Sequence, residues 1–234
     1  MNLLKFSAMT LNEIIIQLKA ASDEKSIEGM KRFGITPEQT YGVKVPVLRA
    51  IAKQTGRDHK LALELWNMNT RETRILTSMI EEIECVSEVD MERYIASFDY
   101  WEICDQFCMN LFEKLPYAYE KAIELAQRDD DFAKRTGFVM MARLAVSDKK
   151  ASNEKFEQFF PYILKESTDN RNMVKKAVNW ALRQIGKRNV TLHKKSIALA
   201  EEIHATDNPT ARWIANDALR ELRNPNIIKR LKNG

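Results

Sequence analysis

Hydrophobic positions recur three or four residues apart along almost the whole chain, and no strand-like alternation of useful length interrupts them. This spacing is typical of amphipathic helices that each bury one face. We expect helices at residues 10–21, 24–33, 45–55, 59–68, 71–85, 88–97, 100–115, 117–128, 132–147, 153–166, 171–188, 191–205, 208–223 and 225–232. Several expected helix starts carry a proline, whose missing N–H leaves no hydrogen bond unmade there: Pro46, Pro116, Pro209 and Pro225.

A weak internal repeat lies in the C-terminal half. The segment Asn-Trp-Ala-Leu-Arg-Gln-Ile at residues 179–185 is echoed 37 residues later by Asn-Asp-Ala-Leu-Arg-Glu-Leu at residues 216–222. A repeat of about 40 residues built from helix pairs is typical of HEAT-like proteins, in which each pair buries its apolar stripe against its neighbours. We therefore expect an all-α fold, an α-solenoid of HEAT-like helical repeats with a concave basic face. Because no linker divides the chain, we expect a single domain over residues 1–234.

The composition supports this fold class and excludes several others. The 234 residues include only 7 Gly and 6 Pro, too few turn formers for an all-β sandwich or barrel. Three cysteines are too few for a disulfide framework and suit a reducing compartment. Polar residues interrupt the apolar ones in residues 1–21, and no uncharged apolar run reaches the roughly 18 residues of a membrane span. We therefore expect a cytoplasmic protein that is neither exported nor membrane-embedded.

Charge is distributed unevenly along the chain. Residues 1–131 hold 16 basic and 23 acidic side chains, a net charge of −7, whereas residues 132–234 hold 21 basic and 10 acidic, a net charge of +11. Clustered Lys and Arg are typical of surfaces that bind phosphates, which favours a polyanionic partner for the C-terminal part. A chance dipole on a helical protein explains the same split, so charge alone leaves both interpretations open.

The sequence contains no motif typical of nucleotide hydrolysis or of a metal site. The triplet Gly-Lys-Arg at residues 186–188 lacks the upstream glycine and the following hydroxyl of a P-loop. His59, His193 and His204 are too dispersed for a metal-ligand spacing. We therefore expect neither ATP hydrolysis nor a metal site built from these histidines.

Two further groups of residues have structural explanations. Cys104 and Cys108 are four residues apart and fall on the apolar stripe of their helix, so we expect both in the core. The acidic run at residues 129–131 could hold a cation, but a charged run just before a helix more often caps that helix and interacts favourably with its dipole.

The helix expected at residues 171–188 carries a tryptophan away from its core face. The buried stripe is predicted to be Val174, Ala177, Val178, Ala181, Leu182 and Ile185. Trp180 lies on another arc of the helix, together with the cations Lys176, Arg183 and Lys187. This indole either packs against an adjacent repeat or offers a stacking surface for a base or sugar, with the cations holding phosphates.

A second tryptophan stands beside a carboxylate. Trp101 and Asp105 are separated by one helical turn and flank an apolar stripe, so the carboxylate is expected to be partly desolvated. It is either a structural acceptor for a neighbouring helix or a functional group. Arg135 likewise borders an apolar face and requires an anion, which is either a structural carboxylate or a phosphate.

Taken together, these residues resemble a known family. The pair Trp101-x-x-x-Asp105, the pair Lys134-Arg135 and the segment at residues 176–183 occur in an order and spacing similar to those of the AlkD-like DNA alkylation repair family of HEAT-like repeat DNA glycosylases. The similarity runs from about Met30 to the C-terminus and includes the segment at residues 41–49.

The resemblance implies excision of positively charged N3- or N7-alkylated purines from duplex DNA without a metal or other cofactor. Asp105 would be the catalytic carboxylate, Trp101 and Trp180 would flank the deoxyribose, and Arg135 would hold the nearby backbone. A cationic purine is already a good leaving group, so a fixed carboxylate near the sugar would act by stabilising an oxocarbenium-like transition state and orienting water.

The other residues predicted to contact DNA are Lys134, Lys176, Arg183, Lys187 and Phe33. Phe33 departs from the family pattern, which suggests a tyrosine after Met-x-Arg, so a hydroxyl contact with DNA is lost at this position. Two alternatives to a glycosylase stay open. One is a non-catalytic binder of damaged or branched DNA that uses the same surface, and the other is a HEAT-like scaffold for another protein. For the glycosylase we expect a monomer.

Overall fold

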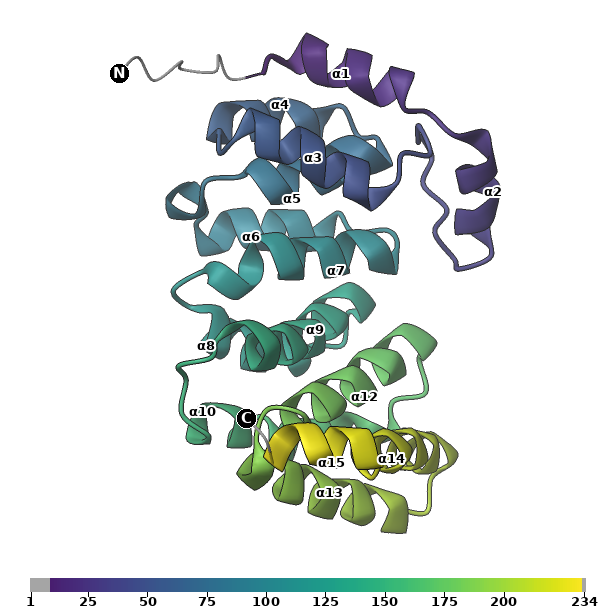
Figure 1. Cartoon of the computed structure of the whole chain (residues 1–234), viewed down its shortest axis with the longest axis vertical. Helices are drawn as coiled ribbons and strands as arrows, with labels where there is room; N and C mark the ends of the chain where they lie inside the picture. Colours follow the sequence, from purple (N-terminus) through teal and green to yellow (C-terminus); the bar gives the residue numbers. More distant parts are fainter. Residues whose placement is uncertain (1–8, 233–234) are drawn as a thin grey trace. The chain divides into compact units, whose positions relative to one another are not determined.

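The computed structural model describes residues 9–232, and within that range every regular element is helical. The chain divides into two compact units, which we call the first unit (Met1–Lys114) and the second unit (Leu115–Gly234). The α-helices of the first unit are α1 (Leu11–Ala20), α2 (Glu24–Lys31), α3 (Val45–Thr55), α4 (His59–Asn67), α5 (Arg71–Ile80), α6 (Glu88–Ala96) and α7 (Trp101–Asn110) (Figure 1). Those of the second unit are α8 (Ala118–Ala126), α9 (Asp131–Ser147), α10 (Glu154–Glu157), α11 (Phe160–Lys165), α12 (Asn172–Gly186), α13 (Val190–Ala205), α14 (Pro209–Leu222) and α15 (Pro225–Lys232). Short 3₁₀ turns η1 (Ile83–Cys85), η2 (Phe112–Lys114) and η3 (Glu166–Thr168) complete the described secondary structure.

Polar side chains at the helix starts explain why the helices begin where they do. A side-chain oxygen accepts a hydrogen bond from the otherwise unsatisfied backbone N–H groups of the first turn. Residues with this role are Thr10, Asp23, Asp58, Thr70, Ser87, Asp130, Asn189 and Asn208. Asp130 confirms that the acidic run caps a helix, since it accepts from the Ala133 nitrogen at 2.7 Å.

The expected helix at residues 71–85 is interrupted in the structure. α5 ends at Ile80, and Glu81 adopts an extended conformation with φ −61° and ψ 136°. The fully buried Glu81 carboxylate accepts hydrogen bonds from the Tyr94 hydroxyl and the Glu82 nitrogen and lies 2.6 Å from His59 Nδ1. These contacts at the end of α5 take the backbone out of the helix, and the short turn η1 follows.

Two other expected helices are also divided. The helix expected at residues 100–115 is split into α7 and η2. The helix expected at residues 153–166 is split into α10, α11 and η3, with Pro161 in the first turn of α11. A proline cannot donate the hydrogen bond that would continue the preceding helix through this position.

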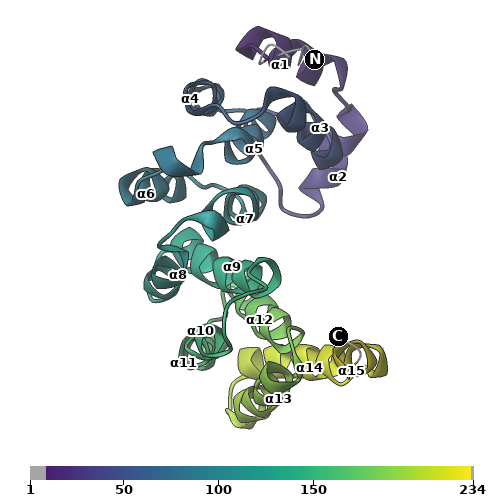
Figure 2. The ribbon, with the colours of Figure 1, turned by 60° about the vertical axis from the view of Figure 1, so that its left-hand side comes forward.

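The helices of the first unit lie in two rows. α3, α5 and α7 follow one another in one row, and α4 and α6 lie in the other (Figures 1 and 2). Between the rows is an aromatic cluster centred on the fully buried Phe107, whose ring centroid lies 4.8 Å from that of Tyr94 and 5.3 Å from that of Trp66. Cys104 and Cys108 are also fully buried, which confirms the prediction that both belong to the core.

The second unit has the same arrangement of rows. α9, α12 and α14 pack consecutively in one row, and α8, α11 and α13 lie in the other (Figure 2). α8 and α9 approach so closely that a Cβ added to Gly137 would lie 2.4 Å from the Ala126 nitrogen. The buried stripe predicted on α12 is confirmed for Val174, Ala177, Val178, Ala181, Leu182 and Ile185.

No described helix is both long enough and apolar enough to cross a membrane. The assignment of residues 1–234 to a single domain stays a prediction.

Candidate nucleic-acid interface

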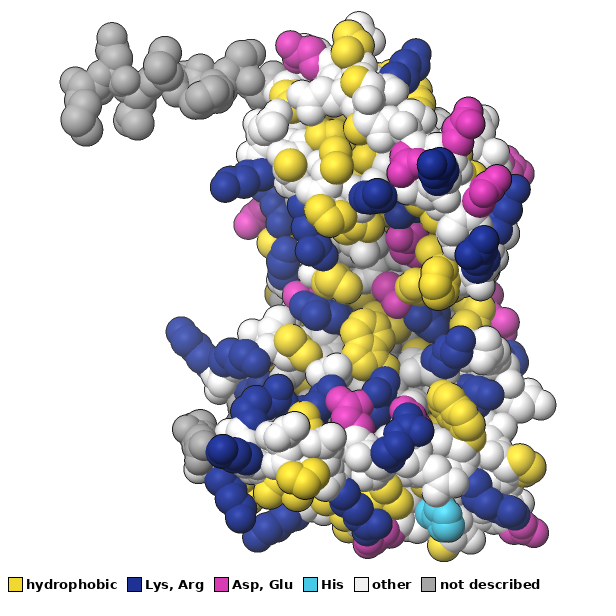
Figure 3. Space-filling model, turned by 45° about the vertical axis from the view of Figure 1, so that its right-hand side comes forward, with side chains coloured by type: hydrophobic (Ala, Val, Ile, Leu, Met, Phe, Trp, Pro, Cys, Tyr) yellow, Lys and Arg dark blue, Asp and Glu magenta, His cyan; other side chains and the backbone are white. Residues whose placement is uncertain are grey.

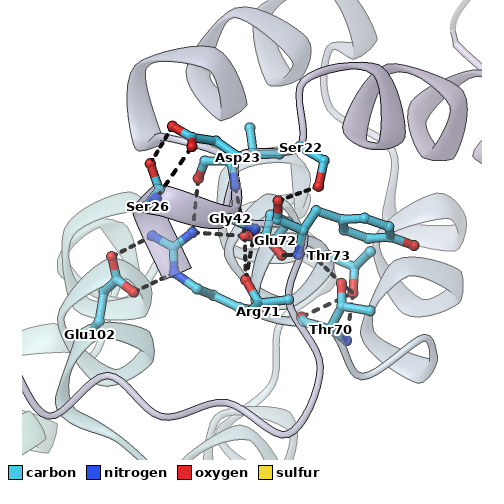
Figure 4. A network of polar contacts seen from close by, with 12 residues as sticks. Ser22, Asp23, Ser26, Gly42, Thr70, Arg71, Glu72, Thr73 and Glu102 are labelled. Carbon is cyan, nitrogen blue, oxygen red and sulfur yellow. Dashed lines mark hydrogen bonds and ion pairs between the residues drawn. The ribbon is translucent and has the colours of Figure 1, made fainter. Parts of the chain in front are cut away.

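A buried ionic network holds the start of α7, the helix that carries Trp101 and Asp105 (Figure 4). The Arg71 guanidinium donates to both carboxylate oxygens of Glu102, from Nε and Nη2, each at 2.7 Å. Its Nη1 donates to Glu72 at 2.9 Å and to the Val43 carbonyl at 2.9 Å. All three charged side chains are buried, so this bidentate pair ties α7 rigidly to α5.

The second carboxylate of the network anchors the segment between α2 and α3. Glu72 accepts hydrogen bonds from the Thr40 hydroxyl and the Tyr41 nitrogen, both at 2.9 Å, and from the Val43 nitrogen at 3.2 Å. Gly42 lies within this segment at φ +74°, where an added Cβ would come within 2.2 Å of the Asp23 carbonyl oxygen. The segment is therefore fixed to α5 by its own backbone.

The ion pairs determine how strongly Arg71 holds its proton. Burial acts to lower the pKa of Arg71, but the hydrogen bonds and charge of Glu102, followed by the charge of Glu72, outweigh burial and raise the pKa above its usual value. The guanidinium is therefore permanently charged, and the network keeps its geometry at every pH at which the two carboxylates are ionised.

The anchored segment in turn holds Trp101. The indole Nε1 donates to the Phe33 carbonyl oxygen at 2.8 Å. The Phe33 side chain is 72% exposed, while the Trp101 side chain is half-buried. The first unit thus combines an exposed phenyl ring with a tryptophan whose orientation is fixed by a backbone acceptor.

Asp105 follows Trp101 by one turn of α7 and is only 7% exposed. In such surroundings the effective dielectric constant is lower than in water, so the carboxylate interacts more strongly with any positive charge that comes near it. The structure therefore places a mostly desolvated carboxylate beside an oriented indole within the first unit. The burial of Asp105 agrees with the desolvation expected from the sequence, and a catalytic role for the two residues stays a prediction.

In the second unit, α12 positions Trp180 among several polar side chains. Trp180 is half-buried, and its indole Nε1 donates to the Gln184 amide oxygen at 2.9 Å when that amide is oriented to satisfy its neighbours. Arg183 forms an ion pair with Glu221 on α14, and Lys187 contacts the same carboxylate at 2.5 Å. Both predicted DNA contacts are therefore paired within the unit: they share the Glu221 carboxylate, and Arg183 Nε also lies 3.6 Å from Asp217.

The adjacent basic residues on α9 are also engaged inside the second unit. Lys134 is buried and lies 2.5 Å from Glu166 and 3.6 Å from Asp169. Its charge is therefore paired within the unit, and contact of Lys134 with DNA stays a prediction. Arg135 is also buried, and its Nη1 donates to the Met173 carbonyl at 2.6 Å. Among the predicted cations of the second unit, Lys176 is the one that lies exposed.

Three features of the two units were not predicted from the sequence. The first is the Arg71 network, and the second is the role of Glu221 as the partner of two α12 cations. The third is Trp213, an exposed tryptophan on α14 with Lys175 above its ring. Trp213 could have been noticed because it is preceded by Arg212 in a strongly basic region.

The net charge of each unit favours a polyanion at the second one. The first unit has 14 basic and 18 acidic side chains, a net charge of −4, and the second has 23 basic and 15 acidic, a net charge of +8. Figure 3 shows Lys and Arg side chains over much of the visible face, with Asp and Glu side chains among them. Among residues 9–232, no group of three or more His, Cys, Asp or Glu side chains is placed to hold a metal ion.

Comparison with solved structures identifies a similar helical-repeat protein. It matches with a TM-score of 0.76 and 19% sequence identity, covering 91% of this chain and 95% of that chain, and it is described as belonging to "a new family of proteins related to the HEAT-like repeat DNA glycosylases with affinity for branched DNA structures". An engineered protein matches with a TM-score of 0.46 and 15% identity, covering 92% of this chain and 99% of that chain. A designed armadillo repeat protein matches with a TM-score of 0.41 and 12% identity, covering 93% and 97%. The first of these likenesses confirms the predicted all-α solenoid fold of HEAT-like repeats.

Comparison of the sequence with curated proteins gave no significant match. Comparison with protein families gave a match over residues 14–225 to the family described as "DNA alkylation repair enzyme". This span includes α7 with its carboxylate and indole, and it extends through α14 in the second unit. The chain therefore belongs to the DNA alkylation repair enzyme family.

Proposed function

We propose that this protein binds duplex DNA and hydrolyses the N-glycosidic bond of positively charged N3- or N7-alkylated purines, with Asp105 as the catalytic carboxylate. The observation that carries the proposal is the placement of Asp105, 7% exposed, one helical turn from an indole held by the Phe33 carbonyl. Membership of the DNA alkylation repair enzyme family supports the substrate class.

The chemistry of the substrate explains why one carboxylate is sufficient. An alkylated purine carries a positive charge and leaves as a neutral base, so no strong general acid is needed. The barrier arises as positive charge builds on the deoxyribose, and a fixed anion next to the sugar stabilises that charge. The same carboxylate can accept a hydrogen bond from the attacking water and orient it.

The indole beside Asp105 adds to this effect. A tryptophan face attracts a cation by roughly 0.5–2 kcal/mol, with the larger values in desolvated surroundings. Trp101 is half-buried and orientationally fixed, so it can present its ring without first losing conformational freedom. The resemblance assigns Trp180 and Arg135, in the second unit, to the same reaction, and those assignments stay predictions.

Binding to DNA would draw on the positive charge of the second unit. Each phosphate that a Lys or Arg contacts releases condensed counterions, so affinity falls steeply with salt concentration. Lys176 is the predicted contact that is most available, because it is exposed and has no ion pair with a carboxylate among residues 9–232. Arg183 and Lys187 share Glu221 and are expected to contribute less.

The test is release of N7-methylguanine and N3-methyladenine from methylated duplex DNA. The variant Asp105→Asn removes the negative charge with little change in shape, and we expect it to slow release by about 100-fold or more while DNA binding persists. Asp129→Asn is the matched control, since that aspartate is exposed and lies outside the site. If the native protein binds DNA but releases no base, the glycosylase proposal is wrong.

A second candidate function is non-catalytic binding of branched DNA. It is favoured by the described affinity of the similar protein at a TM-score of 0.76. The two candidates differ in one measurement, because a binder shows higher affinity for a four-way junction than for a duplex of equal length and releases no alkylated base from either. If the protein is such a binder, the charge of Asp105 does not contribute to affinity, and the Asp105→Asn variant binds four-way junctions as tightly as the native protein does.

A further inference from the structure

Repeat-equivalent helices of the second unit contact each other at a constant separation in the sequence. Residues of α12 that are one helical turn apart meet residues of α14 that lie 38 positions later, in three successive pairs. These pairs are Lys175 with Trp213, Asn179 with Asp217, and Arg183 with Glu221. The two helices are therefore parallel neighbours in register, and each pair occupies one turn.

The first pair differs from the other two in charge. Asp217 and Glu221 are carboxylates that neutralise or hydrogen-bond their partners, whereas Lys175 faces a neutral indole, with its Nζ 4.7 Å from the ring centroid. Neither Lys175 nor the adjacent, exposed Lys176 has an ion pair with a carboxylate among residues 9–232. The positive charge at this end of the α12–α14 pair is therefore not neutralised.

The indole of this pair is also unusually accessible. Trp213 is 41% exposed, although tryptophan is normally buried to a large extent in a folded protein. The preceding residue, Arg212, forms an ion pair with Asp207, so its charge is already matched. What remains at the surface is a partly exposed aromatic ring with the Lys175 ammonium over one face, followed on α12 by the exposed Lys176, in a unit of net charge +8.

We propose that Trp213 and Lys175 form a stacking platform for an unpaired nucleobase of DNA, with Lys175 and Lys176 contacting the adjacent phosphates. This inference rests on the proposed DNA binding and adds to it a second contact, separate from Asp105. An aromatic ring flanked by cations matches the alternation of base and phosphate along a single strand. The base must be unpaired, because a base inside a duplex has both of its faces covered by its stacked neighbours.

The experiment compares two DNA molecules that differ only in unpaired bases. Fluorescence anisotropy measures the dissociation constants of a blunt 20-base-pair duplex and of the same duplex with a six-thymidine 3′ tail, at one salt concentration. We expect the native protein to prefer the tailed duplex. Trp213→Ala is expected to reduce that preference by roughly 5- to 150-fold, the range for loss of one base–aromatic stack, and Trp213→Phe is expected to retain most of it.

Lysine variants separate stacking from general electrostatic attraction. Lys175→Gln is expected to reduce the preference for the tail, whereas Lys194→Gln, the matched control on α13, removes an exposed lysine with no ion pair and weakens both complexes equally. Quenching of tryptophan emission by the tailed DNA provides an independent readout, which Trp213→Phe should diminish. Far-UV circular dichroism verifies that each variant is folded.

Two results would overturn the inference. One is equal affinity of the native protein for the blunt and the tailed duplex, and the other is an unchanged preference in a folded Trp213→Ala variant. Either result leaves the proposed function intact, provided that the blunt duplex is bound and alkylated bases are released. If neither DNA is bound even at low salt, the proposed function and this inference fail together.

Discussion

The Glu72 carboxylate is a point at which the first unit should be sensitive to a small chemical change. It is fully buried and accepts four hydrogen bonds, from the Thr40 hydroxyl, the Tyr41 and Val43 nitrogens and Arg71. The substitution Glu72→Gln keeps the shape of the side chain but replaces one acceptor oxygen with an NH₂ group. It therefore tests whether charge and acceptor number, rather than packing, fix the segment between α2 and α3.

The size of the effect follows from the bonds that would be lost. If the new NH₂ group takes the position of the oxygen nearest Tyr41, one buried backbone N–H loses its acceptor, at about 1–3 kcal/mol. If the amide is turned the other way, the Thr40 hydroxyl, the Val43 nitrogen and Arg71 lose their acceptor instead. Arg71 also loses one of two negative partners inside the protein, although Glu102 remains. Since removal of one partner of a buried ion pair costs about 3–5 kcal/mol, we expect a total loss of about 3–5 kcal/mol.

The assay is urea denaturation combined with hydrogen exchange. The native protein should protect the Tyr41 and Val43 amides, and the variant should lose this protection before the first unit unfolds as a whole. Glu38→Gln is the matched control, because Glu38 is exposed in the same segment and is expected to change stability by less than about 0.5 kcal/mol. A loss below about 1 kcal/mol with both amides still protected would refute the reasoning.

Three further predictions concern the second unit. Gly137→Ala should destabilise the second unit by about 1–3 kcal/mol in urea denaturation, because the new methyl group would meet the Ala126 backbone. The control is Gly29→Ala in α2 of the first unit, where the surrounding space is open and we expect the protein to gain about 0.5–1 kcal/mol. Equal effects of the two substitutions would contradict this reasoning. Burial acts to raise the pKa of Glu221, but its hydrogen bond to Lys187 and the charges of its two partners lower it below the usual 4.5. The Glu221 carboxylate therefore stabilises the fold above pH 4.5, and this contribution is lost as the pH falls through the depressed pKa. Urea midpoints measured from pH 6 to 3 should fall more for the native protein than for Glu221→Gln. Parallel curves for the two proteins would contradict this prediction. Because Glu221→Gln releases two cations from their carboxylate, it should also strengthen DNA binding and steepen its salt dependence, and a weaker complex would count against that expectation.

Most of the fold could be predicted because helix formation depends on local information. The apolar spacing of α12 is complete within residues 172–186, and its predicted stripe is buried. The ends were harder to predict where distant groups determine them. α5 stops at Ile80 because Glu81 is held by side chains from other helices, and nothing within residues 71–85 indicates those partners.

For the candidate site, the sequence predicts residue types and their spacing on one helix, but not the contacts between helices. The pairing of Trp101 with Asp105 follows from positions four residues apart, whereas the bond from Trp101 to the Phe33 carbonyl joins residues 68 positions apart. In the same way, the sequence shows that Arg183 is a cation but not that Glu221, on another helix, neutralises it. Charge counts predict the potential of a surface better than they predict which of its cations are available to a ligand.

The bond between Trp101 and residue 33 uses a main-chain oxygen, which every amino acid possesses. The identity of the side chain at position 33 can therefore change without releasing the indole, provided that the backbone keeps its course. Residue 33 is in this respect a tunable position: exchanging the phenyl group for a phenol or an aliphatic group would alter what the surface offers to a ligand while leaving the tryptophan in place. Variation here offers a route to new ligand preferences in a scaffold whose interior stays the same.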